Sequence, residues 1–340
     1  MEQGILELHP GLVVGFAITV IIMLLLDLGV FNKNSHVVSS KEATIWSVVW
    51  ISLSMIFSGV VYYVFNQDAG GHELAIEKFS QYQAAYWIEK ALSVDNLFVF
   101  ILVFSYFKVP KELHHKVLFW GILGALVFRA IFIFAGVGII NLTYLPEMEL
   151  FGQTVEINIV LALFGLFLVY AGIKSWGGGD DDEDQDFSNS AGANLIKRLY
   201  KVSPNYDGDK FFTVQNGVKI ATPLLVVVAV IEFTDVLFAV DSIPAIFAIS
   251  KDPFILYTSN IFAILGLRSL YFLLANFIHM FSKLPYGLAI ILTFIGVKMI
   301  ISPWFHIPSP VSLGIVGGVL ILSVLLSVAF PDKKEEKDEE

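Results

Sequence analysis

The chain has 340 residues, of which 56% are hydrophobic and only 15% are charged. Its mean hydropathy is +0.74, whereas about a quarter of the residues in soluble domains are charged. This composition excludes a soluble enzyme, a nucleic-acid-binding protein and a disordered protein, and it predicts an integral membrane protein. The net charge of −10 indicates no particular partner, because much of it comes from the solvated acidic runs at 180–186 and 332–340.

The chain contains no cysteine. This excludes disulfide scaffolds, thiolate zinc sites, iron–sulfur clusters and a cysteine nucleophile. Any metal ion that the protein binds must therefore have oxygen or nitrogen ligands.

Nine apolar segments are long enough to cross a bilayer as helices, since a span takes about 20 residues. The apolar part of the first segment is too long for a secretory signal, and no lysine or arginine precedes it, so we expect a retained helix. The nine segments are 10–31, 43–65, 84–107, 116–140, 157–176, 219–248, 255–281, 286–301 and 310–330.

The distribution of lysine and arginine predicts how these helices cross the membrane. If the N-terminus lies outside, the outer side carries only Lys78 and Lys251, and fourteen basic residues lie inside. Cytoplasmic loops carry such an excess of basic residues. We therefore expect a multi-pass membrane protein with an external N-terminus and a cytoplasmic C-terminus. The fourteen residues are Lys33, Lys41, Lys108, Lys111, Lys116, Lys197, Arg198, Lys201, Lys210, Lys219, Lys283, Lys333, Lys334 and Lys337.

Two three-helix units, 84–176 and 219–301, resemble each other in the same order along the chain. In each unit an acid precedes an aspartate by six residues, and an intramembrane arginine and a lysine follow. A unit with an odd number of spans must cross the membrane in the opposite sense to its copy, which is the inverted-repeat architecture of secondary transporters. The matched residues are Glu89, Asp95, Arg129 and Lys174, and Asp235, Asp241, Arg268 and Lys298.

Three further regions complete the organisation of the chain. Residues 1–83 hold two N-terminal transmembrane helices, and residues 302–340 hold the last helix and a charged cytoplasmic tail. Between the two units, residues 177–218 open with three glycines and the acidic run. This composition predicts a flexible, solvated cytoplasmic linker without a function of its own.

Buried acids are the candidate functional residues. A carboxylate in the membrane must be protonated, paired with a base or bound to a cation. The acids within predicted spans are Glu89, Asp95, Glu232, Asp235 and Asp241. Asp27, near the inner end of the first helix, is either an acid that reaches water or a further ligand.

Helical geometry limits which acids can meet. Six residues advance a helix by about 600°, so Glu89 and Asp95 on a straight helix point about 120° apart. We expect Pro244 to break its helix and to free the carbonyl of Val240, so that the acids can converge. Glu232 and Asp235 are three residues apart and share a face. Glu89, Asp95, Glu232, Asp235 and Asp241, with the amide of Asn96, form a candidate oxygen site that suits Mn²⁺, Ca²⁺ or Mg²⁺.

The intramembrane bases have simpler expected roles. Arg129 and Arg268 balance the buried acids, or alternatively an arginine is displaced from a carboxylate when a metal ion arrives. Lys90 forms a local pair with Glu89. Lys174 and Lys298 reach water from helix ends.

Two segments carry a family resemblance. Residues 89–100, EKALSVDNLFVF, and residues 232–245, EFTDVLFAVDSIPA, resemble the signatures of the TerC/Alx family of bacterial membrane proteins. The resemblance covers roughly residues 10 to 330 and places the chain with the LysE-type transporters, which have inverted three-helix repeats. It implies a protein of the bacterial inner membrane that exports Mn²⁺ from the cytoplasm and serves metal homeostasis, with Glu89, Asp95, Asn96, Glu232, Asp235 and Asp241 as metal residues. The tellurium resistance in the family's name has no explanation in these residues.

We therefore expect an all-α polytopic membrane protein that is a secondary transporter and not an enzyme. It exports Mn²⁺ by alternating access, in exchange for protons, and needs no cofactor besides the transported ion. Its partners are the divalent ion, protons and the lipid bilayer, and not nucleic acid. The alternatives are uniport, transport of Ca²⁺ or another hard divalent ion, and a non-transporting insertion or stress-response factor whose acids only pair with Arg129 and Arg268.

Overall fold

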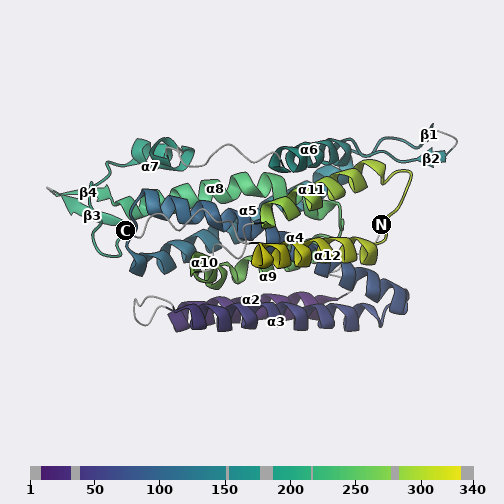
Figure 1. Cartoon of the computed structure of the whole chain (residues 1–340), viewed down its shortest axis with the longest axis horizontal. Helices are drawn as coiled ribbons and strands as arrows, with labels where there is room; N and C mark the ends of the chain where they lie inside the picture. Colours follow the sequence, from purple (N-terminus) through teal and green to yellow (C-terminus); the bar gives the residue numbers. More distant parts are fainter. Residues whose placement is uncertain are drawn as a thin grey trace.

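The computed structural model is a bundle of helices that run along one common axis (Figure 1). It describes residues 9–31, 39–150, 153–176, 187–215, 217–276 and 283–330, without the side chains of residues 26–31, 95, 150, 240, 241 and 276. The long helices are α2 (Pro10–Phe31), α3 (Ser40–Phe65), α4 (Gly71–Tyr106), α5 (Lys111–Leu142), α6 (Ile159–Trp176), α8 (Pro223–Phe247), α9 (Pro253–Leu265), α10 (Leu267–Asn276), α11 (Leu284–Ile301) and α12 (Ser309–Ala329).

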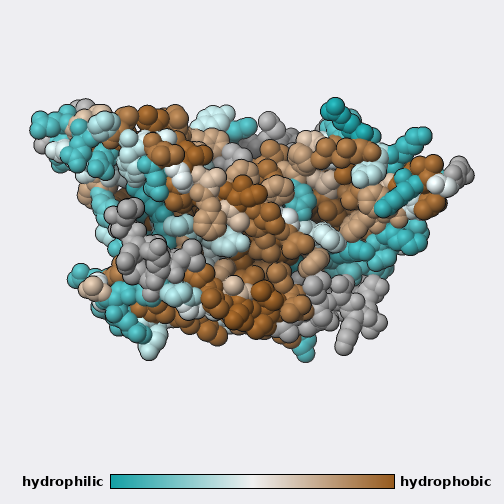
Figure 2. Space-filling view, turned by 180° about the vertical axis from the view of Figure 1, so that it is seen from behind, coloured by the Kyte–Doolittle hydropathy of each residue, from teal (hydrophilic) through white to brown (hydrophobic). Residues whose placement is uncertain are grey.

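The prediction of an all-α polytopic membrane protein is confirmed. Each predicted segment contains a helix, and segment 255–281 contains the pair α9 and α10, which is bent by 43° at Gly266. Six described helices are long and apolar enough to cross a membrane, or seven if this bent pair counts as one span. Apolar side chains form a belt around the middle of the molecule, and hydrophilic ones gather at its two ends (Figure 2).

The polar residues near the helix ends explain several boundaries. The side chain of Asp252 accepts hydrogen bonds from the backbone N–H groups of Phe254 and Ile255 and so starts α9. Proline at the first turn, where a backbone donor is not needed, starts α8 at Pro223. The prediction that this helix begins at residue 219 is wrong, because residues 218–221 pair in a hairpin instead. Helix α4 begins thirteen residues before the predicted residue 84 and ends one residue before the predicted 107.

The two halves of the bundle pack reciprocally. Helix α4 packs against α9, α5 packs against α8, and α6 packs against α11. The last pair is tight because small residues line it: a Cβ at Gly296 would lie 2.6 Å from the carbonyl oxygen of Gly165. Close approach through small residues is the usual way in which helices associate in membranes.

The helix break lies elsewhere than predicted. Helix α8 continues through Pro244 to Phe247, and the backbone N–H of Ala248 donates to the carbonyl of Pro244. Pro244 has no backbone N–H and so leaves the carbonyl of Val240 without its usual helical donor, but the helix does not end there. The prediction that Pro244 breaks this helix is therefore wrong, and the described break in the second unit is at Gly266.

The linker is more ordered than its composition predicts. After the 3₁₀ turn η2 (Phe187–Asn189), helix α7 (Ala191–Leu199) packs against α8, and Gly192 allows this contact because a Cβ there would lie 2.3 Å from the carbonyl oxygen of Ala229. Strands β3 (Phe212–Gln215) and β4 (Val218–Ala221) form an antiparallel hairpin. The expectation of a flexible tether is thus wrong for residues 187–218, and the acidic run lies outside the described residues.

The two ends of the bundle differ in charge. The β3–β4 hairpin lies at one end, and the hairpin of β1 (Met148–Leu150) and β2 (Gln153–Val155) lies at the other (Figure 1). At the first end the Nζ of Lys116 lies 2.8 Å from an Oδ of Asp209, and this hydrogen bond lowers the pKa of the Asp209 carboxyl. At the second end Lys78 pairs with Asp252 at 2.7 Å. Two ends with different loops and charges suit a protein whose two sides face different compartments.

The α6–α11 contact gives a first prediction. Gly172→Ala should lower the free energy of unfolding by about 1–3 kcal/mol, because overpacking strains a close contact: the new Cβ would lie 2.3 Å from Thr293 Oγ1. The matched control is Gly314→Ala, since nothing lies within 4 Å of a Cβ at Gly314 on α12. Thermal unfolding of the purified variants in detergent measures the difference. Equal melting temperatures for the two variants would contradict the tight contact.

Candidate functional site

A buried ion-pair cluster lies between the two halves of the bundle, around Arg129 on α5. The Arg129 side chain has no exposed surface. Its Nη1 donates to Glu89 Oε1 on α4 and, at 3.1 Å, to Asn260 Oδ1 on α9, and its Nη2 donates to Asp235 Oδ1 on α8 at 3.3 Å. One guanidinium thus joins four helices.

Glu89 has the fullest set of partners. Besides the bond from Arg129, its carboxylate accepts bonds from Asn260 Nδ2 at 3.0 Å and from Ser93 Oγ at 3.2 Å. The side chain is fully buried. Hydrogen bonds of this kind compensate for the removal of a charge from water.

Other polar atoms of the cluster lack partners among the described residues. They are Asp235 Oδ2 and Arg129 Nε, and both are buried; elsewhere on α8 the buried Glu232 Oε2 and Ser242 Oγ also lack partners among the described residues. Buried polar groups are normally hydrogen-bonded. The arrangement around Arg129 therefore leaves ligand oxygens that another cation or a water molecule could use.

Glu232 occupies a separate place one turn before Asp235 on α8. Its carboxylate lies against the backbone of α5 at Gly124, where a Cβ would be 1.9 Å from Glu232 Oε2. Only glycine leaves room for this carboxylate, so Gly124 is part of the site's construction. The prediction that Glu232 and Asp235 share a face of one helix is consistent with this placement, since both approach α5.

Lys90 does not form the expected local pair with Glu89. Its buried Nζ instead donates to the backbone carbonyl of Ala263 at 3.1 Å. That carbonyl belongs to the last turn of α9, just before the break at Gly266. Terminal carbonyls of a helix lack intrahelical partners, and a lysine near a helix C-terminus is favourable. Lys90 thus stabilises the break.

The remaining predicted residues do not join the cluster in the described part of the chain. Asn96 on α4 is buried, with 8% of its surface exposed, and Arg268 on α10 is buried with 3% exposed. The side chains of Asp27, Asp95 and Asp241 lie outside the described residues. Helix α4 is continuous through Glu89 and residue 95, so these two positions lie on different sides of one straight helix.

The described side chains do not by themselves form a metal centre. No group of three histidine or acidic residues among them is close enough to hold a metal ion. The cation between Glu89 and Asp235 is Arg129. The ligand set of carboxylates with Asn96 stays a prediction.

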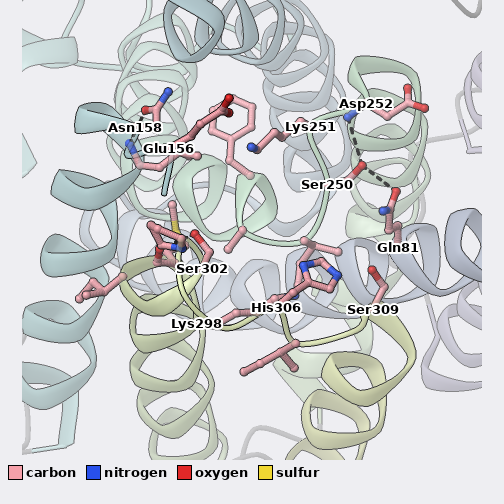
Figure 3. A pocket seen from close by; sticks show the side chains of 18 of the residues that line it. Gln81, Glu156, Asn158, Ser250, Lys251, Asp252, Lys298, Ser302, His306 and Ser309 are labelled. Atoms are coloured by element: carbon pink, nitrogen blue, oxygen red, sulfur yellow. Dashed lines mark hydrogen bonds between the residues drawn. The ribbon is translucent and has the colours of Figure 1, made fainter. Parts of the chain in front are cut away.

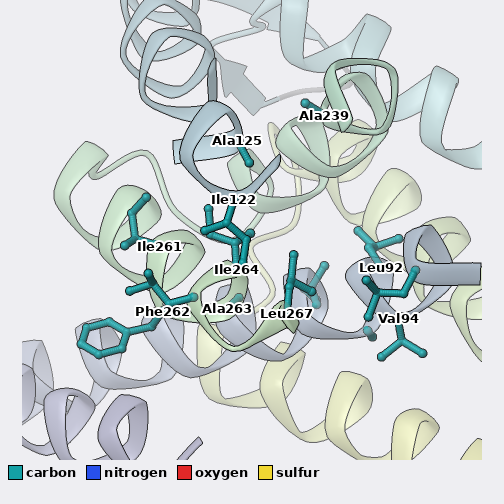
Figure 4. Close-up of a cluster of buried hydrophobic side chains, with 14 of the residues drawn as sticks. Leu92, Val94, Ile122, Ala125, Ala239, Ile261, Phe262, Ala263, Ile264 and Leu267 are labelled. Carbon is teal, nitrogen blue, oxygen red and sulfur yellow. The ribbon is translucent and has the colours of Figure 1, made fainter. Parts of the chain in front are cut away.

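Asn260 is a site residue that the sequence analysis did not select. It is fully buried and binds both Glu89 and Arg129. One signal was available: an asparagine near the centre of the apolar segment 253–265 is costly in a membrane unless it has polar partners. The same four helices also contribute buried apolar side chains, among them Leu92, Ile122, Ala239 and Ile264 (Figure 4).

A cavity of about 1160 Å³ opens at the end of the bundle that carries β1 and β2 (Figure 3). Lys298 lines it and is buried, with its Nζ donating to Ser312 Oγ at 2.8 Å. The expectation that Lys298 simply reaches water is therefore wrong, whereas Lys174 is exposed. Val137 and Phe247 line the cavity on its inner side. Arg129 lies eight residues before Val137, about 12 Å along α5.

Comparisons with known proteins agree on one family. The family model described as "Integral membrane protein TerC family" matches residues 74–335. A Myxococcus xanthus relative named "Uncharacterized membrane protein STKORF319" is 44% identical over 94% of this chain and 92% of its own. Relatives named "Putative membrane-bound redox modulator Alx" are 40% identical in Salmonella typhi, over 95% of both chains, and 41% identical in Escherichia coli K12, over 92% of both. No solved structure matches.

The cluster gives a second prediction, for Asn260→Ala. The variant should lose about 3 kcal/mol of stability, because it removes two hydrogen bonds to charged groups. Ser259→Ala is the control, since the neighbouring Ser259 is equally buried but donates only to the carbonyl of Leu256 in its own helix. Thermal unfolding in detergent compares the two. A smaller loss for Asn260→Ala than for Ser259→Ala would contradict the role of Asn260.

Proposed function

The chain belongs to the TerC family of integral membrane proteins, and on that premise we propose that it is a secondary transporter that exports Mn²⁺ from the cytoplasm by alternating access. The observation that carries this proposal is the buried cluster of Glu89, Arg129, Asp235 and Asn260. An ionisable residue at the centre of a bilayer costs about 2.5–3.5 kcal/mol. Three such residues at one point are typical of an ion pathway.

The packing of the helices supports alternating access. The reciprocal contacts of α4 with α9 and of α5 with α8 are those that a two-fold axis between segments 84–176 and 219–301 would produce. Arg129 and Glu89 belong to the first segment, and Asp235 and Asn260 belong to the second. In inverted-repeat transporters the substrate site lies at this interface.

The available ligands favour a hard divalent ion. Carboxylate and amide oxygens suit Mn²⁺, Mg²⁺ and Ca²⁺, and the chain has no thiolate for a softer metal. Mn²⁺ follows from the family resemblance, and Ca²⁺ is the closest alternative. Carboxylates that release a cation to the outside can take up protons there, so we propose exchange for protons, with uniport as the alternative.

Relatives named as redox modulators suggest a second class of function. The name says what those relatives do, and this chain has no cysteine with which it could carry out thiol exchange itself. The buried ion-pair cluster favours ion transport over a redox reaction of the protein. A non-transporting insertion or stress-response factor has no use for polar atoms without partners at the centre of the bundle.

The charge of the two ends supports an orientation. We propose that the β3–β4 end, near Lys116, Lys210 and Lys219, faces the cytoplasm. The cavity at the β1–β2 end then opens to the outside of the inner membrane. It would be the outer vestibule through which the ion leaves.

Manganese flux gives the third prediction. In proteoliposomes, Glu89→Gln, Asp235→Asn, Asp95→Asn and Asp241→Asn should each lower Mn²⁺ flux more than about tenfold, since the loss of a charged ligand should exceed the roughly 1.4 kcal/mol of binding energy that a factor of ten represents. The control is Glu149→Gln, an exposed acid on β1. Retention of the native melting profile distinguishes lost ligands from lost folding.

Competition and gradients extend the same assay. Ca²⁺ and Mg²⁺ as competitors identify the ion, and flux with and without a pH gradient identifies the coupling. Flux that ignores the gradient would exclude proton exchange. If well-folded native protein moves no divalent ion, the transporter proposal fails and the non-transporting alternative replaces it.

Orientation gives the fourth prediction, and the natural absence of cysteine makes it simple to test. Ser302→Cys, in the cavity, should react in intact spheroplasts with a maleimide that cannot cross the membrane. Asn205→Cys, exposed near the β3–β4 hairpin, should react only after the membrane is permeabilised. The native chain provides the blank. The opposite labelling pattern would reverse the orientation.

A further inference from the structure

Arg129 lies where a transported cation would have to bind. Its guanidinium contacts two carboxylate oxygens, of Glu89 and Asp235, and one amide oxygen, of Asn260. These are the oxygen types that coordinate a hard divalent ion. The guanidinium is therefore a cation that belongs to the protein itself, and it is bound by the same carboxylate and amide oxygens that a divalent ion would use.

Arg129 and a divalent ion cannot both use these oxygens. Without either cation, Glu89 and Asp235 would be two like charges in a buried place, where both could not stay ionised. Removing one partner of a buried ion pair costs about 3–5 kcal/mol. Unless they are protonated, the carboxylates thus require one cation or the other.

The guanidinium is held incompletely, which makes exchange feasible. Arg129 Nε and Asp235 Oδ2 are buried without partners among the described residues. The Nη2 to Oδ1 contact with Asp235 is 3.3 Å, longer than the usual 2.7–2.9 Å or so of a charge-assisted bond. An ion that used both oxygens of Asp235 would gain contacts that Arg129 leaves unmade.

The cluster also joins the two halves that must move. Arg129 on α5 binds Glu89 of its own half, and it binds Asp235 and Asn260 of the other. With the substrate gone, these bonds keep the buried acids neutralised. A carrier with uncompensated acids at its centre could not pass through an occluded state at low cost.

We propose that the guanidinium of Arg129 is a tethered cation that replaces the divalent ion between Glu89 and Asp235. It thereby allows the protein without a bound ion to change back to the conformation in which the site faces the cytoplasm. This inference rests on the proposed transport function. Arg129 is a positioning residue for the empty site and not a ligand. This role distinguishes two activities. Exchange of one Mn²⁺ ion for another requires only that the ion-loaded protein changes conformation, whereas net export also requires that the protein without a bound ion does so.

The test uses proteoliposomes with Arg129→Gln. In this variant, the ratio of net Mn²⁺ flux into vesicles without Mn²⁺ to exchange of external radioactive Mn²⁺ for internal Mn²⁺ should fall at least about tenfold relative to native. Binding of Mn²⁺ by titration calorimetry should tighten about tenfold if the arginine-bound state holds about 90% of the native population. Lys174→Gln, which removes an exposed base at the end of α6, is the control.

The outcomes separate this inference from the proposed function. If native protein shows neither exchange nor net flux of Mn²⁺, the transport function fails. If native protein transports but Arg129→Gln has native net flux, or binds Mn²⁺ more weakly, the tethered-cation role is overturned. Should Arg129→Gln not fold, Arg129→Lys provides the test: an ammonium lacks the guanidinium fork and competes less well, so Mn²⁺ should bind more tightly than to native protein. An unchanged or lower affinity in Arg129→Lys overturns the inference.

Discussion

Neutralisation of buried carboxylates is the constraint on which the rest of this structure depends. Glu89 and Asp235 lie at the centre of a bundle with an apolar belt, where water cannot compensate their charge. Arg129 meets both acids. For this, α4, α5, α8 and α9 must come together at one depth, and the absence of a side chain at Gly124 on α5 leaves room for the nearby carboxylate of Glu232 on α8.

The helix break at Gly266 is stabilised by the same turn of α4 that carries Glu89. A break within a membrane exposes carbonyls that lipid cannot satisfy, so such a break is tolerated only where protein groups replace the lost bonds. Lys90 donates to the carbonyl of Ala263, and it follows Glu89 directly in the sequence. One turn of α4 thus provides both the acid of the cluster and the base that stabilises the break in α9.

The cavity at the β1–β2 end and the cluster are related by the helices that they share. Phe247 at the end of α8 and Val137 on α5 line the cavity, and the same two helices carry Asp235 and Arg129. The ring of Phe247 packs at Gly136, where a Cβ would lie 2.5 Å from its Cζ. Tilting α8 against α5 would change both the cavity wall and the contact between Arg129 and Asp235.

The sequence by itself determined the polytopic helical class, the places of the apolar segments and the buried acids and arginines, because hydropathy and the cost of charge in lipid are local properties. Only the tertiary structure decided that Arg129 meets Asp235, that Asn260 completes the cluster, and that Lys90 binds Ala263 and not Glu89. These pairings join residues as much as 173 positions apart, and no spacing rule within one helix specifies them. Pro244 shows the converse error: a local rule predicted a break, but α8 continues past this residue to Phe247.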